Sequence, residues 1–131
     1  MSRTCLIADA SLMVRRVAAR IVRELGYDVV EARTGVEALD IIRLGLPDVV
    51  LMDWQLGEVS APEFIDAVRG EPGGADTHII LCTANRDLAR ITDALAAGAS
   101  EYIMKPFDSD IIESKFRLAG LPIRKSAAAA A

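Results

Sequence analysis

Residues 49–53 read Val-Val-Leu-Met-Asp, and this short run indicates the architecture of the whole chain. Its first four residues are apolar on both faces, as expected for a central strand of a parallel sheet covered by helices on each side. The run stops at Asp53, which puts a carboxylate at the carboxyl end of the predicted strand. Open α/β sheets bind their ligands at that edge, so Asp53 is a candidate reactive group.

Strand and helix signals alternate on both sides of this run. Short apolar strands are predicted at 5–8, 28–32, 79–82 and 101–104. Helices are predicted at 12–25, from the Thr34-x-x-Glu37 capping box to about residue 44, and at 60–69, 86–97 and 109–118. Five strand-helix units with right-handed crossovers give a doubly wound α/β fold with a five-stranded parallel sheet.

Length and composition limit the possible functions. The chain has 131 residues, enough for one domain, with a formal net charge of -4 and 52% hydrophobic residues. It has no apolar run of the roughly eighteen residues that a membrane span needs and no secretory leader, so we expect a soluble, cytoplasmic protein. The acidic balance argues against direct binding of nucleic acid. Cys5 and Cys82 lie within apolar runs and are predicted to be reduced core thiols.

Polar side chains follow four of the predicted strands, and the topology should gather them at one edge of the sheet: Asp9, Asp53, Thr83 and Lys105. Two carboxylates and a loop carbonyl suit Mg²⁺, which prefers oxygen ligands. A carboxylate can also attack phosphorus to form an acyl phosphate, and Asp53 fits that role. Lys105 would pair with the phosphoryl group, and the Thr83 hydroxyl would donate a hydrogen bond to it.

These residues lie in segments that resemble the receiver domains of response regulators. The segments are Asp9 after the first strand, Leu51-Met52-Asp53-Trp54, Cys82-Thr83-Ala84 and Tyr102-Ile103-Met104-Lys105-Pro106-Phe107. The resemblance covers residue 3 to about 121. Within this family, the chain looks most similar to stand-alone chemotaxis regulators of the CheY type. It implies a flavodoxin-like fold with strand order 2-1-3-4-5, a receiver domain at 1–121, and a C-terminal tail at 122–131 that is disordered or a remnant of cloning.

The resemblance also implies a mechanism. Asp53 would accept a phosphoryl group from a histidine kinase or phosphotransfer protein, with Mg²⁺ held by Asp9, Asp53 and the backbone carbonyl of Gln55. Thr83 would then move toward the phosphoryl group and Tyr102 would rotate inward. A cis peptide before Pro106 would aim Lys105 into the site. The fourth helix, fifth strand and fifth helix would bind a downstream protein, and the chain would be a monomer or weak dimer. Such a protein is a phosphoacceptor switch and not an enzyme, beyond self-phosphorylation and self-dephosphorylation.

The chain departs from the family pattern at two places. Ala10 stands where receivers usually have a second acid that binds Mg²⁺, so we expect weakened metal binding. Leu56 to Ala61 replace the usual proline-containing turn after the phosphoacceptor, and Gly57 makes that loop less constrained.

Three functions therefore remain open from the sequence: a phosphorylation-dependent binding module, a pseudo-receiver that acts constitutively, and a cyclic-dinucleotide effector that uses Arg86 and Arg90. The arginines of the first helix (Arg15, Arg16, Arg20 and Arg23) are predicted to form a solvated face.

Overall fold

The computed structural model describes residues 2–84 and 88–125. The helices and strands, in chain order, are β1 (Arg3–Ala8), α1 (Leu12–Glu24), β2 (Tyr27–Ala32), α2 (Gly35–Leu44), β3 (Val49–Met52), β4 (Gln55–Leu56), β5 (Val59–Ser60), α3 (Ala61–Gly70), the 3-10 turn η1 (Gly74–Asp76), β6 (His78–Thr83), α4 (Leu88–Ala97), β7 (Glu101–Met104) and α5 (Ser109–Leu118). The first two residues of the helix predicted at 86–97 lie outside the described residues.

The main sheet has five parallel strands in the order β2-β1-β3-β6-β7. Counted among these five strands, the order is 2-1-3-4-5, so the predicted doubly wound flavodoxin-like fold is confirmed. β3 is the central strand, with Leu51 paired to Ile7 of β1 on one side and to Ile80 of β6 on the other. Asp53 therefore follows the middle strand of the sheet.

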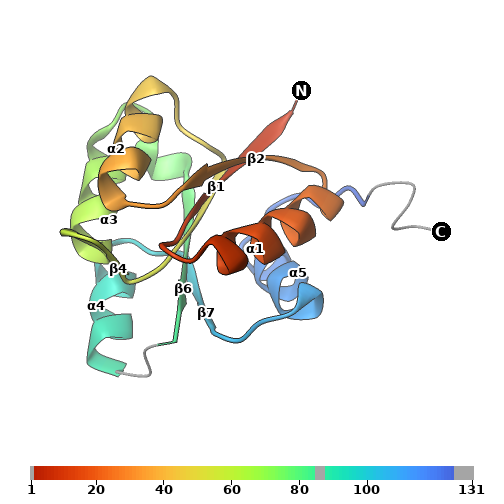
Figure 1. Cartoon of the computed structure of the whole chain (residues 1–131). Coiled ribbons are helices and arrows are strands. Elements are labelled where there is room, and N and C mark those ends of the chain that lie inside the picture. The colour runs from red at the N-terminus through yellow and green to blue at the C-terminus, as the bar shows by residue number, and fades with distance from the viewer. Residues whose placement is uncertain (1, 85–87, 126–131) are drawn as a thin grey trace.

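Helices cover both faces of the sheet, as Figure 1 shows: α1 and α5 lie on one face, and α2, α3 and α4 lie on the other. The strands alternate between two cores accordingly. In β1, Cys5 and Ile7 belong to the core under α1 and α5, whereas Leu6 and Ala8 belong to the core on the other face. This burial on both faces explains why the strands are almost continuously apolar.

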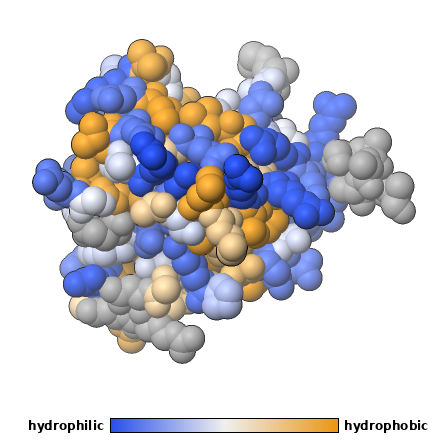
Figure 2. All heavy atoms as spheres, in the orientation of Figure 1, coloured by the Kyte–Doolittle hydropathy of each residue, from blue (hydrophilic) through white to orange (hydrophobic). Residues whose placement is uncertain are grey.

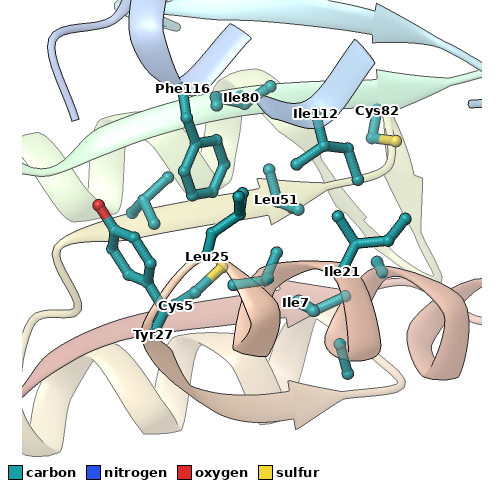
Figure 3. Close-up of a cluster of buried hydrophobic side chains, with 14 of the residues drawn as sticks. Cys5, Ile7, Ile21, Leu25, Tyr27, Leu51, Ile80, Cys82, Ile112 and Phe116 are labelled. Atoms are coloured by element: carbon teal, nitrogen blue, oxygen red, sulfur yellow. The ribbon is translucent and has the colours of Figure 1, made fainter. Parts of the chain in front are cut away.

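The core between the sheet and the α1–α5 layer is closely packed (Figure 3). The rings of Tyr27 and Phe116 meet edge to face with their centroids 5.3 Å apart. Phe116 is completely buried, and truncation of such a side chain typically costs about 3–5 kcal/mol. Cys5 and Cys82 are buried free thiols in this core, as predicted. Burial raises the pKa of both, that of Cys82 to about 12, so neither is a reactive thiolate.

Three helices begin at residues whose side chains cap them, and the cap at Thr34 was predicted from the sequence. The side chains of Thr34, Ser60 and Asp108 accept hydrogen bonds from backbone N–H groups in the first turns of α2, α3 and α5. Each such cap is worth about 1 kcal/mol. The caps fix where the helices start and so keep short the loops that follow the strands.

The segment after Asp53 forms a small hairpin that the sequence did not predict. β4 and β5 pair antiparallel, with Gln55 opposite Ser60 and Leu56 opposite Val59. Gly57 has a φ of 67°, and positive φ at the first of the two turn residues is the pattern of a type II′ hairpin turn, which favours glycine there. Gly57 thus serves a defined turn and does not merely loosen the loop.

Residues 122–125 pack against the turn between α1 and β2. The Tyr27 hydroxyl donates a hydrogen bond to the Pro122 carbonyl at 2.7 Å, and the Arg124 N–H donates one to the Leu25 carbonyl at 2.8 Å. A Cβ added to Gly26 would lie 2.5 Å from the Arg124 carbonyl oxygen. The domain boundary at residue 121 stays a prediction, and residues 126–131 of the predicted tail lie outside the described residues.

The surface is mixed in character. On the face shown in Figure 2, hydrophobic residues form separate patches among hydrophilic ones. Within the described ranges, no helix is long and apolar enough to cross a membrane.

Candidate functional site

Two carboxylates lie at the carboxyl edge of the sheet because the strand ladder continues one residue beyond β1 and β3. The Asp9 N–H donates to the Ala32 carbonyl and the Asp53 N–H donates to the Ala8 carbonyl, both at 3.1 Å. Asp9 is nearly buried, with 6% of its side chain exposed, whereas 28% of the Asp53 side chain is exposed. Asp53 is therefore the more accessible of the two.

Lys105 joins the two carboxylates. Its Nζ lies 2.6 Å from Asp9 Oδ2 and 3.0 Å from Asp53 Oδ2. The Lys105 backbone N–H also donates to the Thr83 carbonyl at 2.9 Å, and the peptide bond to Pro106 is cis, as predicted. Three strands thus bring one ammonium group between two carboxylates, where each of its contacts is a charge-assisted hydrogen bond.

The charge state of Lys105 reflects these neighbours. Burial alone would lower the pKa of the Lys105 ammonium, but the hydrogen bonds to Asp9 and Asp53 outweigh burial and raise that pKa above its usual value of 10.5. The side chain remains a cation at neutral pH. It can therefore neutralise anionic oxygen atoms at this edge of the sheet.

The remaining carboxylate oxygens are held by the backbone. Asp9 Oδ1 accepts a hydrogen bond from the Ser11 N–H at 2.9 Å, and Asp53 Oδ1 accepts one from the Trp54 N–H at 2.7 Å. These bonds leave the Oδ2 atoms of both residues directed to the same nitrogen. The carboxylates are preorganised around a cation, which is lysine in this structure.

The oxygen atoms present fit a hard divalent cation only in part. Asp9 and Asp53 direct oxygens to a common point, but Ala10 is exposed and adds no oxygen ligand. Among residues 2–84 and 88–125, no cluster of three or more His, Cys, Asp or Glu side chains is arranged to hold a metal ion. A magnesium site built here would rely on two carboxylates, a backbone carbonyl and water.

The other predicted site residues lie nearby in the fold. Thr83 is buried at the end of β6, and Gln55 begins the hairpin that follows Asp53. Tyr102 lies in β7 beside Leu81 and is partly buried, with the Nζ of Lys115 5.1 Å from its ring centroid. The roles of Thr83, Gln55 and Tyr102 stay predictions.

Arg15 was not predicted to belong to the site, and the expected solvated face of α1 is wrong at this position. Arg16, Arg20 and Arg23 are exposed, but Arg15 is 5% exposed. Its guanidinium donates to the backbone carbonyl of Asp9 at 2.7 Å. Helical periodicity carried the signal, because Arg15 precedes the buried Ala18 and Val22 by three and seven residues and so shares their inward face.

The two arginines considered for nucleotide binding fare differently. Arg86 lies outside the described residues. The Arg90 guanidinium lies 5.8 Å from the centroid of the Trp54 ring, and Trp54 is the residue that follows the candidate phosphoacceptor Asp53 in the sequence. This cation–π contact engages Arg90 within the chain itself.

Comparison with known proteins agrees with this geometry. The family model for the response regulator receiver domain matches residues 5–117. The chain belongs to the response regulator receiver domain family. This membership confirms the family resemblance found in the sequence.

Among curated proteins, this receiver domain is 35% identical over 112 residues to a chemotaxis protein CheY homolog of Campylobacter jejuni, with 84% of this chain and 86% of the relative covered. It is 32% identical over 115 residues to the chemotaxis protein CheY1 of Helicobacter pylori, with 86% and 93% covered. The receiver domain is therefore of the CheY type.

Two solved structures match it over nearly their whole length. The chemotaxis response regulator CheY4 of Vibrio cholerae has a TM-score of 0.83 at 24% identity, with 91% of this chain and 99% of that one covered. The receiver domain of a sensor histidine kinase from Pseudomonas aeruginosa has a TM-score of 0.79 at 25% identity, with 92% and 99% covered, and has a magnesium ion coordinated in its active-site cleft.

Proposed function

We propose that this receiver domain is a phosphoryl-accepting switch in a two-component relay, with Asp53 as the acceptor. The observation that carries the proposal is the accessible Asp53 carboxylate at the end of the central strand, 3.0 Å from the Lys105 ammonium. A nucleophile that must meet a donor protein has to be reachable, and Asp53 is more exposed than Asp9. The proposed donor is a phosphohistidine on a histidine kinase or phosphotransfer protein.

The transfer step follows from these groups. An oxygen of the Asp53 carboxylate attacks phosphorus, a phosphorus–oxygen bond forms, and the phosphorus–nitrogen bond to the donor imidazole breaks with its electron pair going to that nitrogen. Lys105, which now contacts Asp53, would exchange that contact for one with a phosphoryl oxygen. The hydroxyl of Thr83, at the end of the neighbouring strand, would donate a hydrogen bond to another phosphoryl oxygen. Asp53 thus changes from a carboxylate into a mixed anhydride with phosphate.

Asp9, Asp53 and the backbone carbonyl of Gln55 are the groups that would hold Mg²⁺ in this process. A divalent cation supplies neutralisation of the phosphoryl charge during transfer. The magnesium-bearing Pseudomonas aeruginosa receiver supports the assignment. Because Ala10 adds no carboxylate and Lys105 already bridges Asp9 and Asp53, we infer that metal binding here is weak.

The signal would leave through α4, β7 and α5. Tyr102 is half-buried in β7 and its ring lies under Lys115, whose Nζ also bonds Glu101 at 3.1 Å. Movement of Thr83 toward a phosphoryl group would make room for the Tyr102 ring to turn inward, which changes the surface that a partner meets. The similarity to the CheY proteins of Campylobacter jejuni and Helicobacter pylori favours a target in the control of motility.

The proposal includes the setting predicted from the sequence. The receiver would act in the cytoplasm as a single-domain regulator, monomeric or weakly dimeric, and would bind proteins in preference to nucleic acid or membrane.

Trp54 fluorescence can test the proposal, because Trp54 directly follows Asp53 and its backbone N–H donates a hydrogen bond to the Asp53 carboxylate. Trp54 fluorescence is titrated with Mg²⁺ alone, then with Mg²⁺ and a small phosphoryl donor such as phosphoramidate. The proposal expects a donor-dependent change that is lost in Asp53→Asn. A response that persists unchanged in Asp53→Asn would contradict the assignment of Asp53 as acceptor.

A pseudo-receiver is the second candidate, favoured by the Lys105 bridge and by Ala10. In that case Lys105 permanently replaces the metal, and the chain binds its partner without phosphorylation. Absence of any donor-dependent change at saturating Mg²⁺, together with partner binding equal in wild type and Asp53→Asn, would favour this function. The cyclic-dinucleotide hypothesis stays a prediction. The contact between Arg90 and Trp54 does not support it.

A further inference from the structure

Arg15 is a charged side chain buried directly behind the site. It is 5% exposed and donates hydrogen bonds to two residues outside its own helix. Nη1 donates to the backbone carbonyl of Asp9 at 2.7 Å, and Nε donates to Glu31 Oε1 at 3.2 Å. A buried guanidinium is retained only where its donors are satisfied, so this geometry is specific.

The contact from Arg15 completes a set of hydrogen bonds to the backbone and carboxylate of Asp9. The Asp9 N–H bonds the Ala32 carbonyl of β2, the Asp9 carbonyl accepts from Arg15, and Oδ1 accepts from the Ser11 N–H. Only Oδ2 is left for the cation, now Lys105 Nζ. The Asp9 peptide is therefore fixed between β2 and α1 while its carboxylate points to the site.

Glu31 gives Arg15 a fixed anchor. Glu31 lies in β2 opposite Ile7 of β1, and 33% of its side chain is exposed. A strand position is more rigid than a loop position, and the planar guanidinium can serve both of its partners at once. Lysine at position 15 would keep the charge but would lack the forked guanidinium that contacts both Glu31 and the Asp9 carbonyl.

We propose that Arg15 is a positioning residue that sets the direction of the Asp9 carboxylate, and that Glu31 holds Arg15 for this purpose. The functional part of the inference rests on the proposed phosphoryl-accepting role of Asp53. Because position 10 is alanine, Asp9 is the single carboxylate of the loop after β1. A small change in the direction of the Asp9 carboxylate would therefore remove the one acidic ligand that this loop supplies. Outer contacts of metal ligands typically change metal affinity about 10- to 100-fold.

The first test uses the metal-free protein. The Ser11 N–H donates to Asp9 Oδ1, so the Ser11 amide resonance in a ¹H–¹⁵N spectrum reports the position of that carboxylate. Arg15→Gln should move the Ser11 resonance in the direction that Asp9→Ala moves it, and Glu31→Gln should move it in the same direction by less. The matched control is Arg20→Gln, because Arg20 lies on the same helix and its side chain is 84% exposed. Arg20→Gln should leave the Ser11 resonance unchanged.

The second test separates positioning from a general effect on folding. Mg²⁺ affinity is measured by Trp54 fluorescence in Arg15→Gln, Asp9→Ala and the double variant, and stability is measured in parallel by urea unfolding. Arg15→Gln should weaken Mg²⁺ binding about tenfold in the wild-type background and should have no further effect when Asp9 is absent. Its effect on stability should remain in both backgrounds. Arg15→Lys should restore less than half of the lost affinity on a logarithmic scale.

The two claims fail in different ways. A Ser11 resonance that stays in its wild-type position in both Arg15→Gln and Glu31→Gln would overturn the positioning role, and Glu31→Gln keeps this decisive if Arg15→Gln does not fold. Equal losses of Mg²⁺ affinity from Arg15→Gln with and without Asp9 would also overturn it. A phosphoryl adduct that forms equally in wild type and Asp53→Asn would instead overturn the proposed function and leave the Ser11 test standing.

Discussion

Replacing Lys105 with methionine should expose the balance of charge at the site. The ammonium bridges Asp9 at 2.6 Å and Asp53 at 3.0 Å, and its side chain is 17% exposed. Removing one partner from a buried ion pair costs about 3–5 kcal/mol, because the other charge stays behind. Water reaches the 28% exposed Asp53 and screens part of this loss, so we expect about 3 kcal/mol.

The assay is urea unfolding at neutral pH, first with a chelator and then with Mg²⁺. With a slope of about 2 kcal/mol per molar urea, Lys105→Met should lower the unfolding midpoint by about 1.5 M in the chelator. Mg²⁺ at about ten times its dissociation constant should restore roughly 1.4 kcal/mol, because it binds the folded carboxylates and not the unfolded chain. Wild type should gain less, since Lys105 competes for the same oxygens.

Lys115→Met is the matched control. Lys115 bonds Glu101 at 3.1 Å, and the two side chains are 25% and 24% exposed, but this pair lies outside the carboxylate site. Lys115→Met should cost about 1 kcal/mol or less and should show no greater Mg²⁺ response than wild type. If Lys105→Met matched Lys115→Met both in its stability loss and in its Mg²⁺ response, the idea of a shared cation position would be refuted.

Three further predictions test the packing, the charge and the metal affinity. Gly26→Ala should cost more stability than Gly120→Ala, by about 1 kcal/mol or more in urea unfolding, because both glycines have positive φ but only the new Cβ at position 26 meets the Arg124 carbonyl, and equal costs would contradict this. The raised pKa of Lys105 means that its stabilising contribution is fully present below pH 10.5 and is lost as pH rises through the folded-state pKa, so the stability difference between wild type and Lys105→Met should be constant near neutral pH and should shrink in alkali. Ala10→Asp should tighten Mg²⁺ binding about tenfold or more in the Trp54 titration, because it adds a carboxylate to a site that has two, and unchanged affinity would argue against metal at this edge.

Strong local patterns made most of the fold predictable. Strands β1, β3 and β6 are buried on both faces of the sheet, so each one stands in the sequence as a short continuous apolar run. Such runs predicted strands even though polar and apolar residues do not alternate in them. Capping residues such as Thr34 and Ser60 marked the helix starts because their side chains satisfy free backbone N–H groups. The grouping of Asp9, Asp53 and Lys105 followed from the topology, since Asp9 and Asp53 extend neighbouring strands and Lys105 directly follows β7.

What the sequence did not reveal depends on short elements and on tertiary contacts. β4 and β5 have two residues each, too few to show a period, and Gly57 looked like a source of freedom although it serves the turn between them. Arg15 looked like one of several surface arginines because residue type alone favours exposure. Its burial depends on Glu31 and the Asp9 carbonyl, which come from other elements.

The chemical fate of Asp53 decides whether this domain accepts a phosphoryl group as proposed. Wild type and Asp53→Asn are incubated with Mg²⁺ and phosphoramidate, and intact-mass spectrometry is followed by peptide mapping at acidic pH. Wild type should gain the mass of one phosphoryl group on the peptide containing Asp53, hydroxylamine should release that group, and Asp53→Asn should gain none. An adduct on another residue, or none in wild type at saturating Mg²⁺ and donor, would contradict the assignment of Asp53 as the acceptor.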